Sequence, residues 1–172
     1  MYFTFTIVVS FFWSNLKGEL KNMENITSSL EDYLEAIYIL ELKNKVARIT
    51  GIANHLNIKK SSVSKALKIL AEKDLINYEP YQFVTLKSSG IILARRILNK
   101  HKTLKLFCES ILHINEEDSD AIACKMEHFI SCKNLQNFLH LIDFFKENKE
   151  INELWIAKIE SLNIKEECEK SE

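Results

Sequence analysis

Residues that interrupt regular structure are scarce in this sequence. Its 172 residues include three glycines and one proline, whereas leucine, isoleucine, lysine and glutamate are abundant. So few turn-forming residues exclude a fold made of many tight turns, and the composition favours a mainly helical one. With 47% hydrophobic residues, the chain can bury one core, or two small ones, without disulfides.

Cysteines are also few, and they are irregularly spaced at positions 108, 124, 132 and 168. The apolar N-terminal stretch "MYFTFTIVVSFFW" has no basic residue ahead of it, which excludes an ordinary secretory signal. It is also too short for a bilayer, which a helix crosses in roughly 20 residues. We therefore expect reduced thiols, a cytoplasmic location and no membrane partner.

The first 22 residues are interpreted as a translated leader. Met23 lies just before the first clearly patterned segment, and the triplet Lys17-Gly18-Glu19 can be encoded by AAAGGAGAA, which resembles a bacterial ribosome-binding site. Translation is thus predicted to start at Met23, with residues 1–22 a non-native leader or a disordered tail. The alternative is a short membrane-associating tail.

The net charge of −1 conceals a division along the chain. Residues 43–105 hold 14 lysines and arginines against three acids, a balance of +11, and the remainder has a balance of −12. A basic block of this size indicates a polyanionic partner, and the acidic remainder indicates a cationic ligand or a partner subunit. Two solvated surfaces would give the same balance.

The basic block contains the pattern of a helix-turn-helix. The stretch "ITGIANHLNIKKSSVSKALKIL" predicts a short helix capped by Thr50, a turn and a second helix over residues 60–73. Apolar residues of the second helix follow the spacing of a buried stripe: Val63, Ala66, Leu67 and Leu70. Its other face offers small hydroxyls and lysines, which suit a DNA groove and its phosphates. The predicted DNA-binding residues are Thr50, Lys59, Lys60, Ser61, Ser62, Ser64, Lys65 and Lys68.

The next segment, "LINYEPYQFVTL", alternates like two short strands over residues 75–78 and 83–86, joined by a turn. A hairpin directly after a helix-turn-helix is typical of a winged helix. The alternative is a small helical domain with an incidental hairpin, which leaves the serine- and lysine-rich face unexplained.

Upstream, "SSLEDYLEAIYILE" predicts an amphipathic helix, with an apolar side formed by Leu30, Tyr33, Leu34, Ile37, Tyr38 and Leu42. Asp32 and Glu35 lie one turn apart on this helix and could jointly present oxygen ligands. The pattern from Ser29 to Asp32 also resembles a capping box, and acids in a first turn favour the helix dipole. Spacing alone favours the capping interpretation.

Downstream, a long helix beginning near Gly90 places His101 at its middle. The stretch "AIACKMEHFIS" then carries Cys124, Glu127 and His128 at relative positions i, i+3 and i+4, which share one face of a helix. That face is either a metal site or an ordinary buried seam. A final amphipathic helix, "NLQNFLHLIDFFKENKE", adds apolar surface that indicates a homodimer.

Taken together, these segments resemble the diphtheria toxin repressor family of metal-activated bacterial repressors, including its manganese transport regulator branch. The resemblance runs from about residue 30 to residue 146, and its most specific part is the Cys-x-x-Glu-His helix combined with the helix "EDYLEAIY". It implies an N-terminal winged helix-turn-helix with a small two-stranded wing, followed by an all-helical dimerisation and metal-binding domain. We expect these domains over residues 23–96 and 97–165, and a disordered tail over residues 166–172.

The resemblance also implies a set of metal ligands, namely Asp32, Glu35, His101, Cys124, Glu127 and His128. The first two match the manganese branch, the cysteine matches the iron branch, and the other three match positions that both branches share. Two departures affect the ancillary site of the iron branch, since Lys105 replaces a glutamate and Asp120 a histidine. That site is therefore not expected in its iron-type form.

Metal choice depends on a mixed donor set. Asp32 and Glu35 offer hard oxygen donors suited to Mn²⁺, whereas a thiolate at Cys124 favours Fe²⁺, Co²⁺ or Zn²⁺. Fe²⁺ or Mn²⁺ is the expected co-repressor, with Zn²⁺ or Co²⁺ binding in vitro. Alternatively, Cys124 is an inert core cysteine.

The function implied by the resemblance is repression of metal-uptake genes, by a homodimer on a palindromic double-stranded DNA operator. Two alternatives remain. One is a winged-helix regulator that binds DNA without metal. The other is a helical metal enzyme or storage protein, which would leave the basic block unexplained, so the chain is not expected to be an enzyme.

Overall fold

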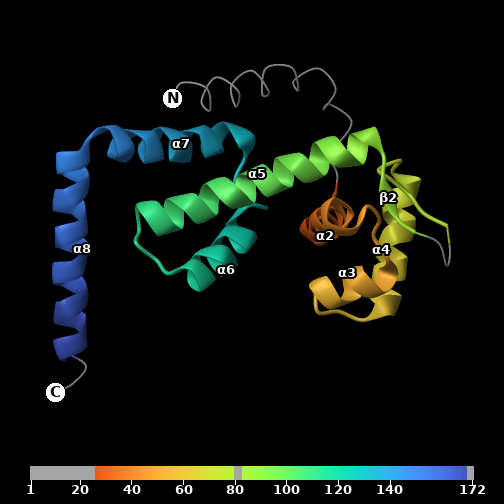
Figure 1. The fold of residues 1–172 in the computed structure, drawn as a ribbon, viewed down its shortest axis with the longest axis horizontal. Coiled ribbons are helices and arrows are strands. Elements are labelled where there is room, and N and C mark those ends of the chain that lie inside the picture. The colour runs from red at the N-terminus through yellow and green to blue at the C-terminus, as the bar shows by residue number, and fades with distance from the viewer. Residues whose placement is uncertain (1–25, 80–82, 170–172) are drawn as a thin grey trace. The chain divides into compact units, whose positions relative to one another are not determined.

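The computed structural model describes residues 26–79 and 83–169. The predicted leader, residues 1–22, and the tip of the predicted hairpin, residues 80–82, lie outside the described residues. The chain divides into two compact units, one ending at Leu93 and the other beginning at Ala94, and each is described by itself (Figure 1).

The N-terminal unit is a helix-turn-helix with a small hairpin, as predicted. Its elements are α2 (Ser28–Asn44), α3 (Ile49–His55), α4 (Lys60–Glu72), β1 (Ile76–Asn77), β2 (Thr85–Leu86) and the start of α5 (Ser88–Ser110). The strands pair antiparallel, with Ile76 opposite Leu86, and an isolated bridge joins Ala47 to Val84. The hairpin is thus shorter than predicted but is extended by a segment that precedes α3.

Apolar side chains from all three helices and the hairpin form the core of this unit. The predicted stripe of α4 is completely buried, and the core also contains Leu34, Ile37, Ile52, Ile76 and Val84. Leu42 was wrongly placed on the apolar side of α2, because it is 68% exposed. Eight residues of α-helix rotate it by about 80° from Leu34. Glu41 lies on that side instead, and both of its carboxylate oxygens accept the backbone N–H of Leu86 at 3.3 Å.

The ends of α2 and α3 differ from the predicted capping. In α2 the N-cap is Thr27, whose Oγ1 accepts the N–H of Leu30 at 3.4 Å, so Ser29 and Asp32 do not form a capping box. In α3 the N-cap is Arg48, without a side-chain bond, and Thr50 already lies in the helix. Both errors have one cause: the extended backbone at Thr27 and Arg48 sets the helix start, and a short sequence pattern does not reveal it.

The C-terminal unit is entirely helical over its described residues. It contains the rest of α5, then α6 (Glu116–Met126), α7 (Cys132–Glu147) and α8 (Lys149–Glu169). The predicted final helix is therefore interrupted at Asn148, whose Nδ2 donates to the carbonyl of Phe144 at 2.7 Å, and Figure 1 shows α8 leaving α7 at a sharp corner. Helix α8 also continues past residue 166, where the sequence predicted a disordered tail, to Glu169.

Aromatic contacts hold the helices of this unit together. Phe107 of α5 packs edge to face on Phe138 of α7, with ring centroids 4.9 Å apart. Trp155 of α8 donates its indole N–H to the carbonyl of Ile111, just beyond α5, at 2.6 Å. Cys108 is buried as a free thiol, and burial raises its pKa.

Gly90 should be intolerant of any side chain. A Cβ at this position would lie 2.0 Å from the carbonyl oxygen of Leu75, whereas a Cβ at Gly51 would meet only Leu40 at 3.5 Å. We expect Gly90→Ala to lower the free energy of unfolding by about 1–3 kcal/mol, because the backbone at Leu75 or Gly90 must move to make room for the added methyl group. Gly51→Ala should raise it by about 0.5–1 kcal/mol, since alanine favours helix. Urea denaturation of both variants measures the difference, and equal stabilities would contradict this packing.

Candidate functional site

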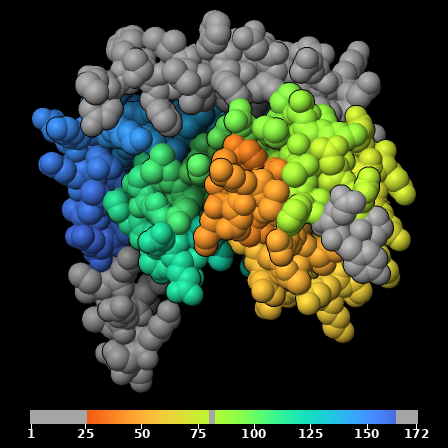
Figure 2. Space-filling model, turned by 45° about the vertical axis from the view of Figure 1, so that its right-hand side comes forward, coloured from red at the N-terminus to blue at the C-terminus, as the bar shows by residue number. Residues whose placement is uncertain are grey.

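The exposed face of α4 carries the predicted cluster of lysines and hydroxyls. Lys60, Ser61, Ser62, Lys65 and Lys68 are all exposed, as is Lys59 at the N-cap. Figure 2 shows the surfaces of α3 and α4, in gold and yellow, adjoining one another. Glu72, the last residue of α4, is the only acidic residue in this helix. The face therefore presents positive charge and small polar groups, as contact with a phosphate backbone requires.

Ser64 differs from the other predicted DNA-binding residues. It is half-buried, and its hydroxyl donates to the carbonyl of Lys60, one turn earlier in α4, at 3.1 Å. Its hydroxyl proton is thus used within the helix. Thr50, by contrast, is exposed in the first turn of α3.

Arg48, the N-cap of α3, is an exposed basic residue that was not among the predicted DNA-binding residues. Its guanidinium carbon lies 4.8 Å from the ring centroid of Phe83, which is 51% exposed beside the hairpin. This cation–π contact joins the start of α3 to the hairpin. A pairing of residues 35 positions apart in sequence leaves no local signal.

Asp32 and Glu35 belong to α2 in the N-terminal unit, and both are half-buried. Burial and the negative charge of Asp32 raise the pKa of the neighbouring Tyr33. The capping box predicted for Ser29 and Asp32 is absent, because Thr27 is the N-cap of α2.

In the C-terminal unit, Glu127 is the centre of a polar cluster. It is the C-cap of α6 and is 0% exposed, an unusual environment for a carboxylate. Its Oε2 lies 2.9 Å from Nδ1 of His101, and its Oε1 lies 3.7 Å from Nε2 of His128. The structure thus brings together three of the predicted ligands, from α5 and from the end of α6.

Within the described part of the chain, Oε1 of Glu127 has no hydrogen-bond donor. A buried carboxylate oxygen without a partner is costly. A cation would satisfy it, and two imidazoles with a carboxylate are donors that divalent transition metals accept. The residues of this cluster therefore fit a metal ion.

Cys124 lies outside this buried environment. Helix α6 ends at Met126, so Cys124 lies within the helix and His128 lies beyond it. Cys124 is exposed, which overturns the interpretation as an inert core cysteine. The predicted face thus combines an exposed thiol with a buried carboxylate.

Lys100 supports Glu127 from α5, a role that the sequence reasoning missed. Its side chain is buried, and its ammonium donates to the backbone carbonyl of Glu127 at 2.6 Å. A cation at the C-terminus of α6 also suits the helix dipole. The sequence does hold a signal, since Lys100 falls within the buried stripe of Leu93, Ile97, Leu104 and Cys108.

Within residues 26–79 and 83–169, no helix is long and apolar enough to cross a membrane. A basic winged helix-turn-helix and a separate helical unit with a carboxylate–imidazole cluster describe a DNA-binding regulator with donors for a cation.

Comparison with known proteins agrees with this description. Residues 25–84 match the family model of the iron dependent repressor N-terminal DNA binding domain, and residues 87–156 match that of its metal binding and dimerisation domain. An HTH-type transcriptional regulator of Methanocaldococcus jannaschii is 39% identical over 123 residues, which cover 71% of this chain and 98% of the relative. The regulator MntR of Bacillus subtilis is 31% identical over 122 residues, 71% of this chain and 85% of its own length.

A solved structure, IdeR of T. acidophilum, has the same fold, with a TM-score of 0.61 and 27% identity. That match covers 70% of this chain and 55% of the solved one, so the chain spans about half of that structure. The chain belongs to the iron-dependent repressor family. It is a metal-dependent transcriptional regulator with a DNA-binding domain and a metal-binding and dimerisation domain, and it is not an enzyme.

Removing the Lys100 ammonium should weaken the C-terminal unit. We expect Lys100→Ala to lower the free energy of unfolding by about 1–3 kcal/mol, because the buried Glu127 carbonyl loses its donor. Lys102→Ala is the matched control, since Lys102 is exposed on the same helix and should change stability by no more than about 0.5 kcal/mol. Thermal and urea unfolding without metal compare the two, and equal effects would contradict the assigned role.

Proposed function

We propose that this chain is a cytoplasmic repressor of metal-uptake genes, with Fe²⁺ or Mn²⁺ as its co-repressor. The observation that carries the proposal is the completely buried Glu127. Its Oε1 accepts no hydrogen bond from the described residues and lies 3.7 Å from Nε2 of His128, while its Oε2 contacts His101. Such a group is costly in an ordinary core and is accounted for by a bound cation. The domains proposed are residues 23–96 and 97–165.

The proposed ligands are Asp32, Glu35, His101, Cys124, Glu127 and His128. A divalent cation would supply positive charge to these carboxylates. Oxygen donors of Asp32 and Glu35 favour Mn²⁺, and the Cys124 thiol favours Fe²⁺. Because Cys124 is exposed, we assign it the weakest contribution and expect the oxygen and nitrogen donors to define the site.

The proposal also explains how metal would control DNA binding. Ligands drawn from α2 and from the C-terminal unit would tie the two units together. In a homodimer this would set the separation of the two α4 helices, which must match half-sites about 34 Å apart on a palindromic operator. Without the cation, clustered carboxylates repel one another and the recognition helices are not held in register.

Metal binding tests the proposal directly. In anaerobic calorimetric titrations of the full chain with Fe²⁺ and Mn²⁺, we expect saturable binding that Glu127→Gln weakens by more than about 100-fold, since it replaces a buried charged donor. Glu117→Gln is the control, because Glu117 is exposed in the first turn of the same helix. Undiminished binding by Glu127→Gln would refute the proposed site.

DNA binding gives a separate test of the α4 face. The probe is a duplex selected from a random-sequence library by the wild-type protein with Mn²⁺. We expect Lys65→Ala and Lys68→Ala each to weaken binding and to lower the slope of log affinity against log salt by about 0.9, as loss of one phosphate contact predicts. Lys158→Ala, exposed in α8, should leave the slope unchanged. Equal affinity with Mn²⁺ and with chelator would favour the metal-independent alternative.

A further inference from the structure

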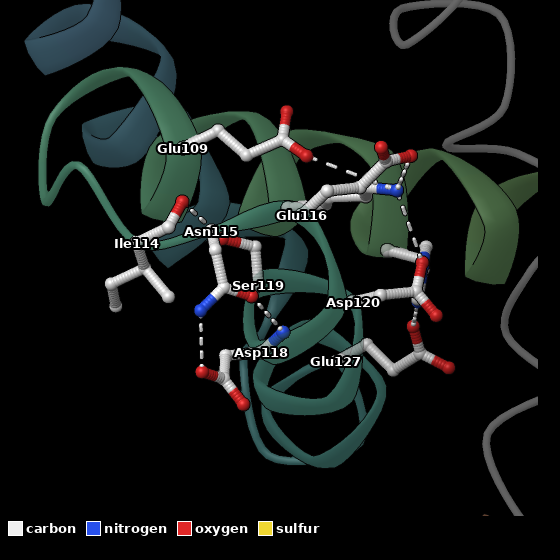
Figure 3. A network of polar contacts seen from close by, with 10 residues as sticks. Glu109, Ile114, Asn115, Glu116, Asp118, Ser119, Asp120 and Glu127 are labelled. Carbon is white, nitrogen blue, oxygen red and sulfur yellow. Dashed lines mark hydrogen bonds and ion pairs between the residues drawn. The ribbon is translucent and has the colours of Figure 1, made fainter.

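A chain of polar contacts leads from the surface of the C-terminal unit to Glu127. It begins at Lys105 of α5, whose ammonium lies 3.2 Å from Oε1 of Glu116, 3.4 Å from Oδ1 of Asp120 and 3.8 Å from Oε1 of Glu109. Figure 3 shows these three carboxylates, with Asp120 nearest to Glu127. One cation thus gathers acids from α5 and α6.

Asp120 connects Lys105 to His101. The same Oδ1 that faces Lys105 lies 3.2 Å from Nε2 of His101, and the other ring nitrogen, Nδ1, lies 2.9 Å from Oε2 of Glu127. His101 therefore stands between two carboxylates, one outer and exposed, the other fully buried. Since a carboxylate only accepts hydrogen bonds, each contact needs a ring N–H or a cation in its place.

The two carboxylates are not equivalent. Asp120 is exposed, and its Oδ1 lies within reach of both the His101 ring and the Lys105 ammonium, so it is an acceptor at the surface. Glu127, in contrast, has a second oxygen without a donor in the described part of the chain, so it is the side on which a cation is needed.

We propose that Asp120, held in place by Lys105, is a positioning residue: when a metal occupies the contact between Nδ1 and Glu127, Asp120 holds the proton of the neutral His101 ring on Nε2, so that Nδ1 is the donor atom for the metal. This inference deepens the proposed function and rests on it for the metal. A neutral imidazole has one N–H, and the nitrogen that binds a metal is chosen by the hydrogen bond of the other.

The position of Lys105 on α5 explains how it can orient the Asp120 carboxylate. It follows His101 by four residues on α5, so both side chains lie on the same face of the helix and reach the same Asp120 oxygen. Exposed ion pairs of this kind contribute little to stability. Orientation of the Asp120 carboxylate is the remaining effect, and Glu116 keeps the ammonium in place from the other side.

Ring spectra of His101 test the positioning role without reference to DNA binding. Long-range proton–nitrogen NMR of the full chain distinguishes the two tautomers, and a His101→Gln variant assigns the signals. In the protein loaded with Zn²⁺ as a diamagnetic probe, we expect the proton on Nε2 and a shifted Nδ1 signal.

Variants of Asp120 and Lys105 distinguish a positioning role toward His101 from a structural role in holding α5 and α6 together. In the Zn²⁺-loaded protein Asp120→Ala should give a mixed tautomer population, and it should weaken Mn²⁺ binding about 10-fold. Asp120→Asn, which keeps an acceptor oxygen, and Lys105→Arg, which keeps the cation, should restore most of both properties, whereas Lys105→Ala should not. Glu117→Gln is the control, because Glu117 is exposed in the first turn of α6, and it should leave the tautomer unchanged.

The outcomes separate this inference from the proposed function. Two outcomes overturn the inference alone. One is metal uptake by a wild-type protein whose His101 ring carries its proton on Nδ1, and the other is a tautomer and an Mn²⁺ affinity that Asp120→Ala does not change. A wild-type protein that takes up neither Fe²⁺ nor Mn²⁺ overturns the proposed function, and with it the metal part of the inference. An Nε2–H ring that depends on Asp120, together with weaker Mn²⁺ binding by Asp120→Ala, upholds both.

Discussion

The C-terminal unit is organised around one buried carboxylate. Glu127 is inaccessible to solvent, and one of its oxygens has no donor among the described residues. In a medium of low polarity such a group is tolerated only if compensating charge or hydrogen bonds surround it. The protein supplies His101 and His128 at its oxygens and the Lys100 ammonium at its carbonyl. These contacts explain why so many polar groups of α5 point toward the end of α6.

Helix α5 carries most of the groups that surround this carboxylate. Lys100 and Lys105 contact the backbone of Glu127 and the carboxylate of Asp120, and His101 lies between them in sequence. The same helix begins in the N-terminal unit, where Gly90 packs against the backbone of Leu75. One helix thus contributes both to the packing of the N-terminal unit and to the polar cluster of the C-terminal unit.

The fold was largely predictable because it rests on periodic burial. The α4 stripe, the helix-turn-helix and the hairpin follow from local spacing, and the structure confirms them. Helix ends were less predictable, as Thr27 and Arg48 show, because a cap depends on the backbone conformation of one residue. Leu42 was misassigned because apolar character alone does not decide which residues of a helix face the core. Here the neighbouring Glu41 faces the hairpin, where it accepts the N–H of Leu86, and Leu42 is exposed.

The sequence by itself determined the class of protein, since a basic block with the helix-turn-helix pattern and the Cys-x-x-Glu-His stretch are local features. It also placed Glu127 and His128 together, because they are adjacent. Only the tertiary structure decided which environment each residue has. Burial of Glu127 and exposure of Cys124, three residues earlier, depend on where α6 ends and what packs there. Likewise, the path from Lys105 through Asp120 to His101 joins separate helices, and contacts between residues distant in sequence arise only on folding.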